Sequence, residues 1–78
     1  LDPSEEKNLC ISIHNKFTVG ERYTKKDIKF MLGELYRDLG INKTPKASDI
    51  EDYFDIKSVL IQVNGKREHG FQLVSKKY

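Results

Sequence analysis

Two clusters of basic and hydroxyl side chains are the residues of this 78-residue chain best suited to bind a charged ligand. The first cluster consists of Lys43, Thr44, Lys46 and Ser48, and the second consists of Lys66, Arg67 and His69. Such side chains bind phosphate through charge and hydrogen bonds, and free backbone N–H groups at a helix start can add to the site. The two clusters therefore predict contacts with the phosphates of a nucleic acid. The alternative is that the second cluster is only a solvated hairpin loop and that Thr44, with Pro45, only starts a helix.

Charge is unevenly distributed along the chain, which matters more than the formal net charge of +2. In residues 61–78, four cations (Lys66, Arg67, Lys76, Lys77) stand against Glu68 alone, a balance of +3. In residues 41–60, three lysines (43, 46, 57) stand against four carboxylates (Asp49, Glu51, Asp52, Asp55), a balance of −1. Carboxylates repel phosphate, so we expect contacts with the DNA backbone and little reading of sequence in the major groove.

The four carboxylates between Asp49 and Asp55 are also the residue types that bind Mg²⁺ or transfer protons. Neither a nucleophile nor a phosphate-binding loop accompanies them, so we interpret them as a solvated face. We therefore expect a domain without catalytic activity, cofactor or small-molecule substrate.

Cys10 and His14 are four residues apart and would meet on a helix, but two ligands are too few for a metal site. A single cysteine cannot form an internal disulfide, which favours a reducing, cytoplasmic location. The chain has neither a signal peptide nor an apolar run long enough for a membrane span. Because it begins at Leu1 without a methionine, we expect a fragment of a longer protein, with residues 1–78 forming one domain.

A short helix is predicted after Lys43, and two start signals compete for it. Thr44 can cap it with Pro45 in the first helical position, or Ser48 can form a capping box with Glu51. The predicted apolar side consists of Ala47, Ile50 and Phe54 with Tyr53 beside them, and the opposite side of Lys46, Asp49 and Asp52.

A first helix is predicted over residues 3–15. Asp2 can cap it, Pro3 fits its first position and Glu5 completes a capping box. Its apolar residues at steps of four are Leu9, Ile13 and Phe17. Alternation from Leu9 to Ile13 would also fit a strand, but the start signals favour a helix.

A second helix, residues 25–39, has the strongest pattern in the chain. Thr24 is its predicted cap, and Gly40 ends it. The apolar stripe consists of Ile28, Met31, Leu32, Leu35, Tyr36 and Leu39. We expect Leu35, in the middle of this stripe, to be buried.

The last third of the chain predicts a β-hairpin, from alternating apolar residues in 56–63 and 71–74. Asn64-Gly65 would form a tight type I′ turn, or residues 64–70 would form a longer basic loop. Val19 and Tyr23 could add a brief strand, and residues 75–78 are expected to fray. Tyr36, Tyr53, Phe54 and Phe71 are predicted to belong to the core.

The order helix, short strand, helix, helix and hairpin predicts an α+β fold and is similar to that of winged-helix domains, which combine a helix-turn-helix with a β-hairpin wing. More narrowly, Tyr23–Ile28, Leu39–Ile50, Tyr53-Phe54, Gly65–Arg67 and Gly70-Phe71 resemble the C-terminal tail of primase-helicase replication proteins of phages and mobile elements. The resemblance covers residues 17–77.

This resemblance implies an accessory module of a DNA replication protein that binds duplex DNA largely without sequence preference. Other replication proteins are further expected partners, and ATPase or primase chemistry would belong to the rest of the parent protein. The alternative is a protein-interaction winged helix, in which the acidic face of the third helix meets a basic partner.

Overall fold

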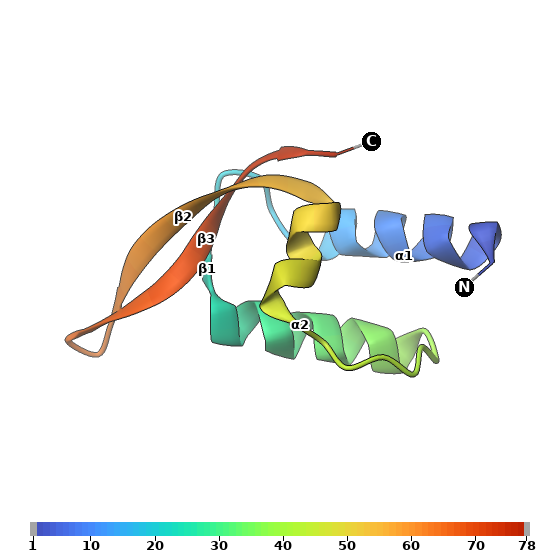
Figure 1. Ribbon diagram of the computed structural model, residues 1–78, viewed down its shortest axis with the longest axis horizontal. Coiled ribbons are helices and arrows are strands. Elements are labelled where there is room, and N and C mark those ends of the chain that lie inside the picture. Colours follow the sequence, from blue (N-terminus) through green and yellow to red (C-terminus); the bar gives the residue numbers. More distant parts are fainter. Residues whose placement is uncertain (1, 78) are drawn as a thin grey trace.

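A computed structural model describes residues 2–77 and shows an α+β fold (Figure 1). Its elements are α1 (Pro3–Lys16), β1 (Arg22–Thr24), α2 (Lys25–Asp38), the 3₁₀ helix η1 (Ala47–Asp52), β2 (Phe54–Val63) and β3 (Lys66–Lys76). The three strands form one antiparallel sheet in the order β1-β3-β2. The last strand in the chain therefore lies in the middle of the sheet.

The starts of both α-helices follow the predicted signals. The Glu5 backbone N–H donates to Asp2 Oδ1 over 2.8 Å, and the Asp27 backbone N–H donates to Thr24 Oγ1 over 3.0 Å. Each cap satisfies a backbone donor that has no partner within its helix. Both predicted caps are confirmed, and α1 continues to Lys16, one residue beyond the predicted end.

The core lies between the two α-helices and the sheet. Its buried side chains are Leu9, Ile13, Phe17, Ile28, Leu32, Tyr36, Ile50, Phe54 and Leu73. The Phe17 ring packs edge-on against Tyr23 and Phe54, with centroid separations of 5.2 and 6.4 Å. The predicted stripe of α1 is confirmed, as are Tyr36 and Phe54 as core residues. Tyr53 and Phe71 are half-buried against the same core.

The side of α2 that faces the core is centred on Leu32 and Tyr36 and not, as was predicted, on Leu35. Tyr36 is 1% exposed, whereas Leu39 is 40% exposed and Leu35 is only half-buried. Residues 28, 32 and 36, spaced by four, form the line that faces the core, and Leu35 packs at its border. The prediction that Leu35 is buried was therefore wrong.

Both predicted starts of the third helix were wrong. Thr44 and Pro45 lie in a stretch without regular secondary structure. Pro45 packs so closely against Gly33 of α2 that a Cβ added at Gly33 would be 3.3 Å from Pro45 Cγ. The Asp49 carboxylate holds the start of η1 by accepting the Lys46 backbone N–H over 3.2 Å. The helix ends at Asp52, so Phe54 begins β2 instead of continuing the helix.

A tight turn joins β2 and β3. Asn64 and Gly65 have φ values of 50° and 80°, and Val63 pairs directly with Lys66. Positive φ at both central positions is the signature of a type I′ turn, for which Asn-Gly is the preferred sequence. The alternative of a longer loop over residues 64–70 was wrong, and its basic residues belong to β3.

The short strand β1 approaches β3 at a glycine. Tyr23 pairs with Phe71 and Thr24 with Gly70, whereas Val19 lies outside the strand and is 41% exposed. A Cβ at Gly70 would collide with the Tyr23 carbonyl oxygen and lie 3.0 Å from Thr24 Cα. Only a residue without a side chain allows β1 to come this close.

Residues 75–78 were predicted to fray. Tyr78 lies outside the described residues, but the chain before it is held in place through Lys77. The strand β3 continues to Lys76, and the Lys77 backbone N–H donates to the Tyr53 carbonyl over 2.9 Å. The Lys77 ammonium also donates to the Glu51 carbonyl over 2.7 Å. These bonds tie the end of β3 to the junction of η1 and β2.

Candidate nucleic-acid interface

The turn end of the β2–β3 hairpin extends beyond the helices (Figure 1). Because β1 pairs only with residues 70–72, the start of β3 has a neighbouring strand on its β2 side alone. Lys66, Arg67 and His69 are all exposed there, and neither Lys66 nor Arg67 forms an ion pair with any residue in the range 2–77. Their charges are therefore available to a ligand.

Strand alternation divides these residues between the two faces of the hairpin. Arg67 and His69 share one face with Phe71, while Lys66 shares the other with Glu68. The second predicted cluster is thus not a single patch. It places one strong cation on each side of a narrow two-stranded ribbon, where each can contact a phosphate.

The row on the Arg67 face continues onto α2. Lys25 Nζ lies 5.6 Å from the centroid of the Phe71 ring, a cation–π contact. Lys29, one turn further along α2, is also exposed. These lysines were not predicted from the sequence to belong to the site, because only the pairing of β1 with β3 places the start of α2 beside the hairpin.

The first predicted cluster lies elsewhere, in the stretch that leads into η1 and in η1 itself. Its members Lys43, Thr44, Lys46 and Ser48 are exposed. Lys43 Nζ is 3.9 Å from Asp49 Oδ2 and 5.6 Å from the centroid of the Tyr36 ring. The Asp49 carboxylate also occupies the Lys46 backbone N–H, a donor that the phosphate prediction had counted as free.

The prediction that Asp49 belongs to a solvated face was therefore wrong. Its carboxylate accepts a hydrogen bond of 3.0 Å from the Tyr36 hydroxyl, and its side chain is only 12% exposed. Burial of the phenol, together with this bond to a carboxylate, raises the pKa of Tyr36 well above its usual range. The pair joins α2 to η1.

Replacing Tyr36 by Phe should lower the free energy of unfolding by about 1–3 kcal/mol at neutral pH, because Asp49 loses its donor. The raised pKa of Tyr36 adds stability that is complete below the unfolded pKa of about 10 and is lost as the pH rises further. Urea unfolding at about pH 8 and pH 11 should show a smaller alkaline loss in Tyr36→Phe than in the wild type. If both proteins lose the same free energy of unfolding between these two pH values, ionisation of Tyr36 does not contribute to the alkaline loss of stability.

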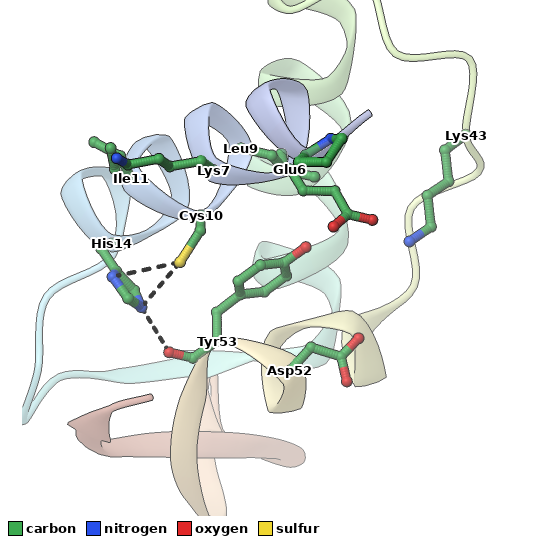
Figure 2. A pocket seen from close by; sticks show the side chains of 10 residues that line it. Glu6, Lys7, Leu9, Cys10, Ile11, His14, Lys43, Asp52 and Tyr53 are labelled. Carbon is green, nitrogen blue, oxygen red and sulfur yellow. Dashed lines mark hydrogen bonds between the residues drawn. The ribbon is translucent and has the colours of Figure 1, made fainter. Parts of the chain in front are cut away.

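A groove of about 750 Å³ lies between α1 and the η1 region (Figure 2). On its wall, Cys10 Sγ is 3.9 Å from each ring nitrogen of His14, and His14 Nε2 is 2.8 Å from the Tyr53 carbonyl oxygen. That nitrogen therefore carries the proton and donates it. No three His, Cys, Asp or Glu side chains among residues 2–77 are placed to hold a metal ion. His14 thus connects α1 to the start of β2.

Within residues 2–77, the helices are too short and too polar for any of them to cross a membrane. Comparison of the chain with protein-family models, with curated proteins and with solved structures found no match.

Proposed function

We propose that this chain is a non-catalytic winged-helix module that binds the backbone of duplex DNA largely without regard to sequence. The single observation that carries the proposal is the projecting hairpin, on which Lys66 and Arg67 are exposed and free of ion pairs. The element order and the sheet order β1-β3-β2 are compatible with a winged helix, in which such a hairpin is the wing.

The proposed contact is made by the hairpin and the start of α2, and not by insertion of the third helix. A helix that enters the major groove needs length and a surface compatible with phosphate. The helix η1 is a six-residue 3₁₀ helix whose Glu51 and Asp52 are exposed. Residues 22–29 hold four cations (Arg22, Lys25, Lys26, Lys29) against Asp27, a balance of +3.

Secondary contacts are proposed for Lys43, Thr44, Lys46 and Ser48. The Asp49 carboxylate limits them, because it lies near the Lys43 ammonium and accepts the Lys46 backbone N–H. A role as an accessory module of a replication protein in the cytoplasm rests on the sequence resemblance and on the single cysteine. The alternative, a protein-interaction module, would use Glu51, Asp52 and Asp55, since Asp49 is engaged within the fold.

The test is fluorescence anisotropy with a labelled short duplex and the matching single strand, between about 50 and 200 mM salt. If Lys66, Arg67, Lys25 and Lys29 each neutralise one phosphate, log affinity for the duplex should fall with log salt at a slope of about −3.6. Unrelated duplex sequences should bind alike.

Absence of duplex binding at the lowest salt would refute the proposal. The protein-interaction alternative would then be supported by capture of a basic protein that is lost in Glu51→Gln/Asp52→Asn. Asp49 is unsuitable for that comparison, because its carboxylate holds Tyr36 and the start of η1.

A further inference from the structure

Two of the free strand edges in the sheet differ in chemistry, namely the part of β3 beyond β1 and the outer edge of β2. On β3, the stretch not covered by β1 is protected by charged or titratable side chains, namely Lys66, Arg67, Glu68 and His69. On β2, which pairs with β3 alone, residues 58–63 carry no charge at all. Charged side chains on an edge strand oppose pairing with a strand of another chain. The free part of β3 is therefore protected against such pairing, whereas residues 58–63 of β2 are not.

From this difference we propose that two copies of the chain pair antiparallel through their β2 edges. Pairing of this kind is isologous, because it uses the same surface on both copies and stops at two. It would join the two sheets into one, with strand order β1-β3-β2-β2-β3-β1 across the pair. The proposal does not require the proposed DNA binding, but Lys66 and Arg67 take part in both.

The sequence of β2 favours a register centred on Leu60, whose side chain is 53% exposed. In this register Leu60 faces Leu60 of the second copy, and Val59 faces Ile61 on the other side of the sheet. Ser58 faces Gln62, and Lys57 faces Val63. Pairing over residues 57–63 spans about 24 Å, and no like charges stand opposite each other.

Charge also favours a second copy as the occupant of this edge. The antiparallel arrangement carries the turn end of each hairpin towards the start of β2 in the other copy. The turn end carries Lys66 and Arg67, whereas the start of β2 has exposed Asp52 and Asp55 against Lys57, a balance of −1. Opposite charges therefore approach one another at both ends of the paired strands, and the two-fold symmetry repeats the attraction.

Sedimentation equilibrium of the chain, without DNA, should show a concentration-dependent monomer–dimer equilibrium. Leu60→Lys places two lysines face to face on the two-fold axis and should weaken dimerisation about tenfold or more. The matched control is Val74→Lys, since Val74 is 55% exposed on β3 and outside the β2 edge. It should dimerise like the wild type.

Disulfide cross-linking identifies which residues of the two β2 strands lie opposite each other. It gives a result even if the charged variant Leu60→Lys fails to fold. In a Cys10→Ser background, Leu60→Cys should give a cross-linked dimer on mild oxidation, because directly opposed residues in antiparallel strands have the required spacing. Mixing Ser58→Cys with Gln62→Cys should cross-link the two different chains. Val74→Cys should not cross-link.

Three outcomes would overturn the proposal. One is a wild-type chain that stays monomeric up to about 1 mM. Another is equal weakening by Leu60→Lys and Val74→Lys. The third is growth beyond two copies, because isologous pairing consumes both free β2 edges.

Discussion

The double substitution Lys66→Glu/Arg67→Glu is expected to weaken duplex binding at least roughly 50-fold at about 0.1 M salt. Loss of two phosphate contacts makes the slope of log affinity against log salt shallower by about 1.8. If the two proteins bind equally at about 1 M salt, this difference in slope over one decade of salt gives the loss of affinity at about 0.1 M. Because both side chains are exposed and unpaired within the described range, the fold should be unaffected. Anisotropy titrations against salt measure both effects, with circular dichroism as the check on folding.

The matched control is Lys7→Glu/Arg37→Glu, which changes the total charge by the same amount. Both residues are exposed, Lys7 on α1 and Arg37 in the last turn of α2. The N-terminal part of α1 and the C-terminal end of α2 lie towards the end of the molecule opposite the hairpin turn (Figure 1). If the control weakens binding as much as the hairpin variant, the effect comes from net charge, and the hairpin is not the contact.

The largest effect on stability is expected for Leu32→Ala. Leu32 is 0% exposed on α2, within the line of residues that faces the core. Truncation removes buried methyl groups and leaves a cavity, which should lower the free energy of unfolding by about 2–5 kcal/mol. In a domain this small that is a large share of the total of about 5–15 kcal/mol. Urea denaturation of the two proteins measures the difference.

Leu35→Ala is the internal comparison for this prediction. It removes the same atoms from the same helix, but Leu35 is only half-buried, so we expect about half the loss. A loss for Leu35→Ala equal to or greater than that for Leu32→Ala would contradict the orientation of α2 described above.

Elements whose signals are local could be predicted from the sequence. In each α-helix, the capping side chain bonds a backbone N–H only three residues later, and an apolar repeat follows. In the hairpin, alternating β-branched residues lead into the Asn64-Gly65 turn. These features depend only on neighbours in the chain. The helical repeat does not determine which line of α2 is central, however, so the sequence favoured Leu35 where the structure places Tyr36.

The third helix was misplaced because distant residues decide its start. Pro45 follows a cap-like Thr44, but its ring packs against Gly33 of α2. Asp49 has the periodicity of a surface residue, but it accepts a hydrogen bond from Tyr36, thirteen positions earlier. Neither contact leaves a local signature in the sequence.

The candidate site shows the same division. Clustering of basic residues near Lys66 and Arg67 was visible in the sequence, and the structure places them on an accessible hairpin. That Lys25 extends this row depends on the pairing of Tyr23 with Phe71, which only the folded sheet shows. The limits placed on Lys43 and Lys46 by Asp49 were equally invisible.

The position of β1 at the edge of β3 has a consequence for the order of folding. Residues of β1 pair with partners 46 to 50 positions later, as Thr24 with Gly70 and Arg22 with Gln72 show. The β2–β3 hairpin closes over a two-residue turn, so it can form locally. Pairing of β1 with β3 closes most of the chain into a loop, and the conformational entropy of that loop is lost before the pairing contributes stability. On a ribosome, α2 would be complete long before β1 has a strand to join, and the sheet would be completed only once Gln72 has emerged.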